Sequence, residues 1–405
     1  MQPLQTLPEP DPAAMNHSRA VKEMIRAEIT ACGGWISFAH YMRLVLYTPG
    51  IGYYSGGAEK IGREGDFVTA PEISALFGGA IARQVAQVLE FMENSGAAAN
   101  ILEFGAGTGK LALDLLLELE KLDRLPRRYF ILEVSADLRQ RQRQLLESGA
   151  AHLASRVAWL ENLPDRFCGL MLANEVLDAM PVHLVVWRGA NLFERGVTYR
   201  HSHAREFEWE DRPLIQGELL QAALALGMVG GSDGDGRASG GHYVSEIGLA
   251  ARHFLPSVAQ ALQKGAILLI DYGFGREEYY HPQRERGTLM CHYRHHAHDD
   301  PFFLPGLQDI TSHVDFTAIA DAAARAGLEL LGYASQAHFL INCGIVEILA
   351  QSSAGNAKDY LPLSSQVQKL VSPAEMGELF KVIAFGKGVH PPLKGFISGD
   401  RSRML

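Results

Sequence analysis

Short apolar segments alternate with longer amphipathic segments over much of the chain. Each apolar segment has the length of a strand, and most of the segments between them have helical periodicity. The apolar segments lie at 99–104, 128–134, 156–161, 169–176, 265–273, 327–333 and 380–388. Apolar strands that alternate with helices are typical of a mostly parallel sheet with helices on both faces. The pattern therefore predicts an α/β fold of the Rossmann-like kind.

Further helices are expected outside this alternation. A helical region covers about 17–46, and a further helix begins near Thr69 and runs to about Met92, with Pro71 and Glu72 in its first turn. Ser74 is expected to lie too late in that segment to act as a helix cap. A third helix is expected after the glycine-rich loop that ends at residue 242, with Gly265 just past its C-terminal end.

The pattern changes after Pro181. Three segments, 183–189, 191–199 and 205–211, alternate between apolar and polar residues with a period of two, as hairpin strands do. The segment 227–242 consists mostly of Gly, Ser and Asp. We therefore expect it to be a mobile loop that is dispensable for cofactor binding.

These changes of pattern predict a domain organisation. We expect a tail, an N-terminal helical segment that closes over the cofactor, a Rossmann-like core in two pieces, an inserted lobe, a substrate-side lobe with the last core strands, and a second tail. In that order, the expected ranges are 1–17, 18–92, 93–181 with 243–275, 182–242, 276–390 and 391–405.

Composition narrows the class of protein. Hydrophobic residues make up 47% of the 405 residues, enough for a sizeable core, and the net charge of −9 argues against a general nucleic-acid binder. Four cysteines without metal-type spacing favour a reducing compartment. The chain has no apolar run of about 18 residues and no recognisable leader pattern. We therefore expect a bacterial cytoplasmic protein without a membrane partner, and the oligomeric state stays open.

A glycine-rich loop follows the first core strand. Glu103 lies two residues before Gly105, and Gly105, Gly107 and Gly109 form a G-x-G-x-G pattern that includes Thr108. A dinucleotide loop prefers G-x-G-x-x-G, which lets the helix pack near a pyrophosphate. S-adenosylmethionine (SAM) has no phosphate, and its ammonium group suits a carboxylate such as that of Glu103. We therefore expect SAM at this loop, and the alternative is a tight turn between strand and helix.

A second acid strengthens the nucleotide interpretation. Glu133 ends the next strand, where a carboxylate can accept both ribose hydroxyl protons. Val134 and Leu160 are the expected apolar neighbours of the adenosine, whereas Trp159 is expected in the core. The alternative for Glu133 is an exposed charge at a strand end.

Polar residues after the fourth strand are candidates for the acceptor site. In such a fold these residues face the methyl group, so Asn174 would orient a nucleophile while Glu175 and Asp178 clamp a cationic acceptor. If residues 175–178 form a helical turn, both acids lie on one face. The alternative is that they are ordinary loop residues, with Asp178 capping the turn before Pro181.

A histidine-rich segment at 291–300 is compatible with a metal site or with a loop that orders the substrate. We favour the loop, because the segment shows no strand or helix framework and no second ligand group at recognisable spacing. His313 is a candidate general base, but we favour the alternative of a buried histidine with satisfied hydrogen bonds. Thr311 or Asp315 is expected to cap a following helix. No metal ion is expected. The candidate ligands in this segment are His292, His295, His296 and His298, with Cys291 and Asp299 beside them.

Over about residues 18–390 the chain resembles the MidA family, which includes a mitochondrial complex I assembly factor. The matching stretches include GYYSGG, LEFGAGTGKLA, ANEVLDAMPV, LLIDYGF and QDITSHVDF. The resemblance implies a class I SAM-dependent methyltransferase fold with an extra lobe. One departure is Ala70, where the family pattern leads us to expect serine. By motif, Thr69, Pro71 and Glu72 would close over SAM, and Glu103, Gly105, Gly107, Glu133 and Asn174 would hold it.

For the mitochondrial relative, the resemblance implies methylation of an arginine in a complex I subunit. The leading hypothesis for this chain is therefore a protein methyltransferase that acts on an accessible arginine, with a respiratory-chain subunit as one candidate partner. One alternative is a SAM-binding assembly factor with little turnover. A second alternative, an NAD-dependent oxidoreductase, is disfavoured by the glycine spacing.

Overall fold

The computed structural model describes residues 7–56, 68–200, 206–227, 242–352, 357–390 and 392–405. Contacts within the chain divide it into two compact units, each with its own apolar core. The first unit comprises residues 1–67, 179–251 and 277–313, and the second comprises 68–178, 252–276 and 314–405. Residues 68–92, which the sequence grouped with the N-terminal helical segment, therefore belong to the second unit.

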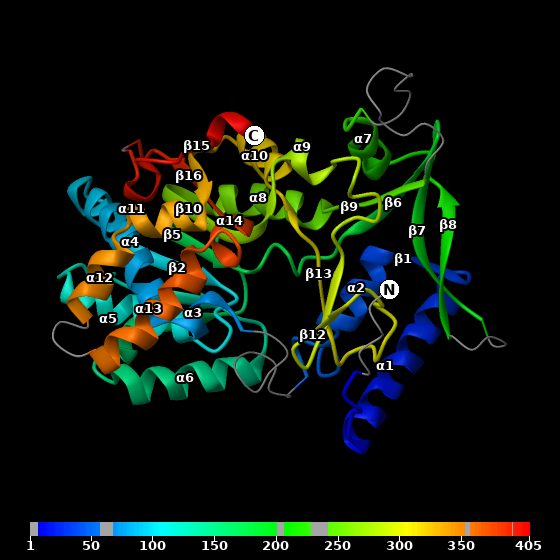
Figure 1. The fold of residues 1–405 in the computed structure, drawn as a ribbon, viewed down its shortest axis with the longest axis horizontal. Helices are drawn as coiled ribbons and strands as arrows, with labels where there is room; N and C mark the ends of the chain where they lie inside the picture. The colour runs from blue at the N-terminus through cyan, green and yellow to red at the C-terminus, as the bar shows by residue number, and fades with distance from the viewer. Residues whose placement is uncertain (1–6, 57–67, 201–205, 228–241, 353–356, 391) are drawn as a thin grey trace. The chain divides into compact units, whose positions relative to one another are not determined.

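The second unit contains an eight-stranded sheet. Neighbouring strands follow the order β15-β16-β10-β5-β2-β3-β4, and the short β14 (Val314–Asp315) pairs with the end of β10. Figure 1 shows the central strands of this sheet side by side. The seven main strands are β2 (Asn100–Phe104), β3 (Tyr129–Leu132), β4 (Val157–Leu160), β5 (Phe167–Asn174), β10 (Leu262–Phe274), β15 (Glu329–Ser335) and β16 (Phe380–Lys387).

Strand direction and order place a ligand site at one edge of this sheet. β4, β3, β2, β5 and β10 are parallel to one another, and only β16 runs antiparallel between β10 and β15. The chain order reverses at β2, which has β3 on one side and β5 on the other. Ligands of open α/β sheets bind outside the carboxyl ends of the strands at such a reversal. The α/β class and all seven predicted core strands are confirmed.

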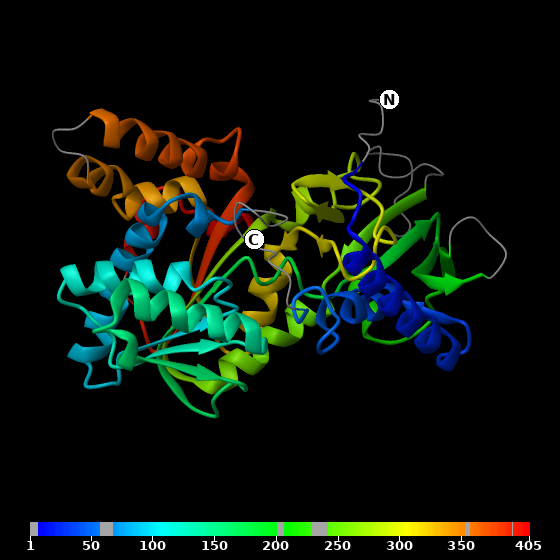
Figure 2. The same cartoon turned by 90° about the horizontal axis from the view of Figure 1, so that it is seen from below.

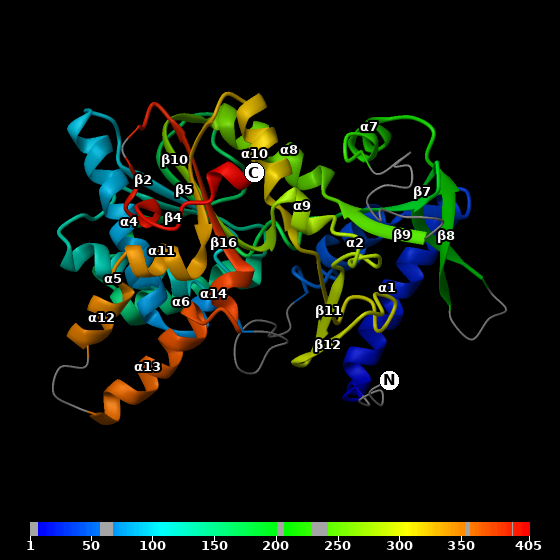
Figure 3. The ribbon, with the colours of Figure 1, turned by 45° about the horizontal axis from the view of Figure 1, so that its top comes forward.

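Different helices cover the two faces of the sheet. On one face, apolar residues of β2, β5 and β10 share a buried cluster with α4 (Ala75–Asn94), α5 (Lys110–Lys121) and α11 (Gln336–Asn342). On the other face, Phe104 contacts Phe254 of α8 (Leu249–Ala261), and α10 (Phe316–Arg325) packs on β10 and β15. Figure 3 shows α4 and α11 on one side of the sheet and α8 and α10 on the other. The remaining helices of this unit are α3 (Ala70–Ile73), α6 (Ala136–Ala150), α12 (Ile345–Ser352), α13 (Ala357–Val371) and α14 (Met376–Leu379).

Two predicted features near β10 are wrong. The helix expected to reach Lys264 ends at Ala261, and residues 242–247 before it form a strand. Gly265 lies inside β10 rather than just past a helix. Its φ is 141°, and a Cβ there would lie 1.8 Å from the carbonyl oxygen of Gly169. The glycine is therefore required by the close approach of β10 to β5.

The helix predicted from Thr69 to Met92 is interrupted. α3 begins after Thr69, as predicted, with Pro71 and Glu72 in its first turn, but it ends at Ile73. Ser74 has an extended backbone and begins α4, because its hydroxyl accepts a hydrogen bond from the Leu76 N–H at 3.3 Å. The expectation that Ser74 caps nothing is therefore wrong. By contrast, Asp315 caps α10 through the Ala318 N–H at 3.0 Å, as predicted.

Removal of the Ser74 cap is expected to destabilise the protein. Ser74→Ala leaves the N–H of Leu76 without this buried acceptor and should lower the free energy of unfolding by about 1 kcal/mol. Urea denaturation measures the change, and Ser148→Ala at an exposed position of α6 is the control. Equal stability of the two variants would contradict the capping role.

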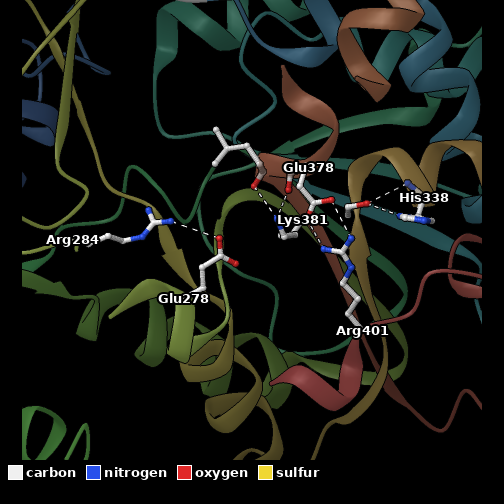
Figure 4. A network of polar contacts seen from close by, with 8 residues as sticks. Glu278, Arg284, His338, Glu378, Lys381 and Arg401 are labelled. Atoms are coloured by element: carbon white, nitrogen blue, oxygen red, sulfur yellow. Dashed lines mark hydrogen bonds and ion pairs between the residues drawn. The ribbon is translucent and has the colours of Figure 1, made fainter. Parts of the chain in front are cut away.

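The C-terminal residues 392–405, which the sequence assigned to a tail, pack on the second unit. Phe396 is buried against Phe339, and Arg401 forms an ion pair with Glu378. Figure 4 shows Arg401 and Lys381 on either side of Glu378. Two short 3-10 helices, η2 (Lys394–Phe396) and η3 (Ser402–Met404), lie in this segment, and a third, η1 (Ala154–Arg156), precedes β4.

The first unit is built on a five-stranded antiparallel sheet. Its strands follow the order β1-β7-β6-β9, with β8 paired to β7. Side chains alternate along β6, so that Leu184 joins a core with α1 and α2 while Val185 joins a second cluster with α7. Figure 2 shows the two N-terminal helices, in blue, beside the green strands. The three predicted hairpin strands are confirmed. These elements are α1 (Pro12–Ala31), β1 (Trp35–Ser37), α2 (Phe38–Tyr47), β6 (His183–Arg188), β7 (Asn191–Tyr199), β8 (Phe207–Pro213), α7 (Glu218–Leu224) and β9 (His242–Ile247).

The helical region expected at 17–46 consists of α1 and α2, with the short strand β1 between them. Gly33 and Gly34 have φ values of 76° and 92°, which end α1 and allow the chain to enter β1. α1 begins at Pro12, because Asp11 caps it through the Ala14 N–H at 2.9 Å. Residues 12–17, expected as part of a tail, are therefore helical.

Three further expectations concern membrane-spanning segments, the cysteines and the loop at 227–242. No helix among the described residues is long and apolar enough to cross a membrane. All four cysteines are free thiols. The loop predicted at 227–242 falls almost wholly on residues 228–241, which lie outside the described residues.

Candidate functional site

The glycine loop joins β2 to α5 at the predicted place. Gly105, Gly107 and Gly109 have φ values of 60°, 53° and 88°, in the left-handed region that favours glycine. Gly109 directly precedes α5, and a Cβ there would lie 3.2 Å from Cγ of Gln142. The loop therefore leads into a helix N-terminus, a position at which backbone N–H groups commonly bind a ligand.

Glu103 lies near the end of β2, two residues before Gly105 of the loop. Its carboxyl group accepts a hydrogen bond of 2.7 Å from the Tyr129 hydroxyl, and its side chain is buried. Burial raises the pKa of Glu103 to about 7, the Tyr129 hydrogen bond opposes this rise, and the neighbouring Glu133 adds to it. The predicted contact of Glu103 with the SAM ammonium group therefore requires that its proton be lost.

Glu133 follows β3 at the same edge of the sheet. Its backbone N–H donates to the carbonyl of Leu160 at 3.2 Å, which places the residue next to the end of β4. Its carboxylate accepts the Ser135 N–H at 2.9 Å, and burial raises its pKa. The adjacent Val134 is 71% exposed, unusually high for a valine, so an apolar surface is open beside the Glu133 carboxylate.

Sequence reasoning missed Gln142, a buried residue of α6 that contacts several of these groups. Its side-chain amide donates to the carbonyl of Gly107 at 2.9 Å and to the carboxylate of Glu133 at 3.3 Å. The indole N–H of Trp159 donates to its side-chain oxygen at 2.8 Å. Trp159 packs against the core, as expected, with this polar contact in addition. The available signal in the sequence was a glutamine on the same helix face as the apolar Leu146 and Ala150.

The N-terminal segment of the second unit contacts the loop and the end of β5. The Thr108 hydroxyl donates to the carboxylate of Glu72 at 2.5 Å. The Ala70 N–H donates to Glu175 at 3.3 Å. Thr69 begins α3 without a side-chain cap, and Pro71 is buried. The structure thus brings Glu72 to Thr108 in the glycine loop and Ala70 to Glu175, which follows β5.

The segment after β5 is not a helical turn. Residues 175–178 have no helical assignment, and Glu175 has a φ of 53°, which is uncommon for a residue with a side chain. The premise that places Glu175 and Asp178 on one helix face is therefore wrong. Asn174 instead donates to the carboxylate of Glu175 at 3.1 Å, and Asp178 is buried.

Asp271 of β10 organises this segment and was also missed. One carboxylate oxygen accepts the N–H groups of Val176, Leu177 and Asp178 at 3.2, 2.9 and 3.2 Å. Burial raises the pKa of Asp271 well above its ordinary value, and the nearby Asp178 and Glu175 raise it further. The rule that selected Glu103 and Glu133, an acid at the end of an apolar strand, applies equally to Asp271 in ILLIDYG.

A buried lysine lies on the strand next to Asp271. Lys381 of β16 is the register partner of Asp271 of β10, and directly opposed residues of antiparallel strands project to the same face. The ammonium group of Lys381 donates to the carbonyl of Glu378, as Figure 4 shows. Asp271 therefore shares a face of the sheet with the buried Lys381.

The histidine-rich segment belongs to the first unit and forms a hairpin. Residues of β11 (Met290–Tyr293) pair with β12 (His296–His298) and with β13 (Asp309–Thr311), so the expectation of no strand framework is wrong. Among the described residues, the group that could hold a metal ion is Glu28, Cys32 and His40, which includes none of these histidines. α9 (Arg276–Tyr279) precedes the hairpin.

His313 ends the first unit. Its N–H donates to the Thr288 hydroxyl at 3.1 Å, and its side chain is half-buried. Its role as a general base stays a prediction.

Comparisons with known proteins identify the cofactor. Residues 80–334 match the family described as "Putative S-adenosyl-L-methionine-dependent methyltransferase". A crystal structure of a COG1565 superfamily member from Burkholderia thailandensis, bound to S-adenosyl-homocysteine, is 50% identical. The structural alignment covers 99% of this chain and 100% of the Burkholderia protein, with a TM-score of 0.90.

Curated relatives are more distant. The mitochondrial protein arginine methyltransferase NDUFAF7 homolog of Drosophila melanogaster is 27% identical over 96% of this chain and 90% of its own length. The human protein arginine methyltransferase NDUFAF7 is 26% identical over 87% of this chain and 80% of its own length.

The residues at the loop fit SAM. Three left-handed glycines precede a helix N-terminus, a carboxylate follows the next strand, and an exposed valine lies beside it. The family match and the relative bound to S-adenosyl-homocysteine agree with the predicted cofactor and weigh against a dinucleotide. The chain therefore belongs to the MidA/NDUFAF7-like family of SAM-dependent methyltransferases.

Proposed function

We propose that this enzyme transfers the methyl group of SAM to a guanidinium nitrogen of an arginine in a protein. The observation that carries the proposal is a group of three carboxylates, Glu175, Asp178 and Asp271, at the carboxyl ends of β5 and β10. The curated relatives named as protein arginine methyltransferases give independent support.

The electrostatics of the three acids favour a cationic acceptor. Burial raises the pKa of Asp271, and Asp178 and Glu175 raise it further because negative charges close together repel one another. A guanidinium group relieves this repulsion, and its planar arrangement of five N–H donors matches carboxylate oxygens. Glu175 is half-buried, whereas Asp178 and Asp271 are buried, so Glu175 is the acid we assign to direct contact with the acceptor.

The same acids suit the chemistry of the transfer. SAM supplies the methyl group, and a bond from nitrogen to carbon forms as the bond from sulfur to carbon breaks. Arginine has a pKa above 12 and is a poor nucleophile while its charge is delocalised. Glu175 would hold one N–H, localise the charge, and accept the proton that leaves the methylated nitrogen. Asn174 would orient Glu175 through the hydrogen bond that it already donates.

Exchange of Glu175 tests this assignment. Glu175→Gln preserves shape but removes the negative charge, so methyl transfer should fall at least about tenfold, or 1.4 kcal/mol in the barrier. Affinity for S-adenosyl-homocysteine should persist. Asp178→Asn is expected to reduce transfer as well, through its effect on the same carboxylate group.

The assay uses SAM with a labelled methyl group and protein extracts as acceptors, followed by hydrolysis and separation of methylated amino acids. Label in methylarginine supports the proposal, whereas label in methyllysine or in small molecules refutes it. Asp165→Asn, at an exposed position of the same unit, is the control. Normal turnover in Glu175→Gln would refute the role of that residue.

The resemblance adds a partner and a compartment to the proposal. A respiratory-chain subunit is the target class that it implies, and the bacterial cytoplasm is the compartment that we expect. The second candidate is a SAM-binding assembly factor with little turnover. Absence of any transfer to extract proteins, together with normal S-adenosyl-homocysteine binding, would favour that candidate.

A further inference from the structure

The side chain of Gln142 connects three separate parts of the cofactor site. It is fully buried on α6, and its amide contacts the glycine loop at Gly107, the acid that follows β3 at Glu133, and the indole that ends β4 at Trp159. These partners lie 35, 9 and 17 residues away in the chain.

The indole fixes the orientation of the amide. An indole N–H is a donor only, so the side-chain oxygen of Gln142 must face Trp159. Both N–H bonds of the amide then point to acceptors, the carbonyl of Gly107 and the carboxylate of Glu133. A glutamate or an apolar residue of similar size would lose these two donors.

Packing and hydrogen bonding both place Gln142 at the site. The last glycine of the loop lies directly against it, since a Cβ on Gly109 would come within 3.2 Å of its side chain. The other residues of the buried face of α6 are Leu146 and Ala150, which are apolar. A polar residue on a buried helix face is tolerated when its groups are hydrogen-bonded, and here three such bonds are made.

We infer that Gln142 is a positioning residue for the cofactor, which aims the Glu133 carboxylate at the ribose hydroxyls and holds the glycine loop in its binding conformation. This inference rests on SAM binding at the loop and is independent of the acceptor. A hydrogen bond to a carboxylate favours its charged form, so the amide also keeps Glu133 ionised at lower pH.

Calorimetry with S-adenosyl-homocysteine tests the inference. Gln142→Leu is expected to weaken binding about tenfold or more, the scale of a lost hydrogen bond to a charged group. Gln144→Leu, at an exposed position of the same helix, should leave the affinity unchanged. Thermal unfolding without ligand monitors the fold of each variant.

Two readouts separate positioning from general support of the fold. In the Glu133→Ala background, Gln142→Leu should cost much less affinity than in the parent protein, because its main partner is absent. The affinity of the Gln142→Leu variant should also begin to fall at a higher pH than that of the parent protein as the solution is acidified. Additive losses with an unchanged pH profile would overturn the inference.

If the Gln142→Leu variant does not fold, Gln142→Glu provides a second test of the inference. It preserves volume but puts a second carboxyl group against Glu133, so its loss of affinity relative to the parent protein should be largest at pH 8 and smallest at pH 6. A loss that does not depend on pH would contradict the inference. Because these measurements need no methyl acceptor, failure to find methylarginine would count against the proposed function alone.

Discussion

Glu133→Ala is expected to weaken S-adenosyl-homocysteine binding by about 1.5–3 kcal/mol, a loss of roughly 10- to 150-fold in affinity. The carboxylate of Glu133 follows β3 beside the glycine loop and is fixed by the Ser135 N–H and the Gln142 amide. A ribose diol that donates to this carboxylate makes charge-assisted hydrogen bonds, which alanine cannot replace.

Isothermal titration at pH 8 measures the loss, because burial raises the pKa of Glu133 and a high pH favours its ionised form. Glu147→Ala, at an exposed position of α6, is the control. Unchanged affinity in Glu133→Ala, with its thermal unfolding intact, would remove Glu133 from the cofactor site.

Glu103→Gln is expected to stabilise the protein without ligand at pH 8 and to weaken cofactor binding at the same pH. The pKa of Glu103 is raised from its ordinary value of 4.5 to about 7, chiefly by burial. The folded protein therefore keeps a proton that the unfolded chain releases. The contribution of Glu103 to stability is most favourable below pH 4.5 and is lost as the pH rises to about 7. At 1.36 kcal/mol for each pKa unit, the full loss is about 3 kcal/mol.

Glutamine has no proton to release, so Glu103→Gln should exceed the parent protein in stability by up to about 3 kcal/mol at pH 8 and by little near pH 5. It also lacks the charge that would meet the SAM ammonium group, so binding should weaken. Urea denaturation at several pH values and calorimetry measure the two effects, with Glu147→Gln as the control. A difference in stability that stays constant between pH 5 and 8 would contradict the raised pKa.

These opposite effects distinguish a binding role from a structural one. If the carboxyl group of Glu103 served packing alone, its replacement by an isosteric amide would not weaken ligand binding. Functional sites commonly contain groups that improve ligand binding although they lower the stability of the protein, and a buried acid at pH 8 is such a group. Glu103 would then be kept for the ligand, with the Tyr129 hydroxyl as its partner before binding.

Errors in the sequence interpretation concern places where distant segments meet. Ser74 begins a new helix because α3 ends early, at Ile73, while the first residue of α3, Ala70, donates its N–H to Glu175, 105 residues away in the chain. Gly265 looked like a helix C-terminus, but the close approach of Gly169 explains it. For Gly265 the residue type was noticed, but the neighbour that explains it lies 96 residues away in the chain and was absent from the local pattern.

Asp271 and Gln142 were missed because their contacts also join segments that are distant in the chain. Asp271 accepts three N–H groups from a loop about 95 residues earlier, and that contact exists only because β10 pairs with β5. Gln142 reaches Gly107 and Trp159 only because β2, β3 and β4 are adjacent in the sheet. No spacing rule along the chain relates these positions.

The sequence by itself determined the strands of the core, the glycine loop, the acid after β3 and the cap at Asp315, because periodicity, turn geometry and capping depend on residues a few positions apart. The tertiary structure alone decided which partners the polar groups of the site receive. Glu103 is held by Tyr129, Glu175 by Asn174 and Ala70, and the loop after β5 by Asp271. Buried polar groups must find partners, and sheet order decides which distant segments supply them.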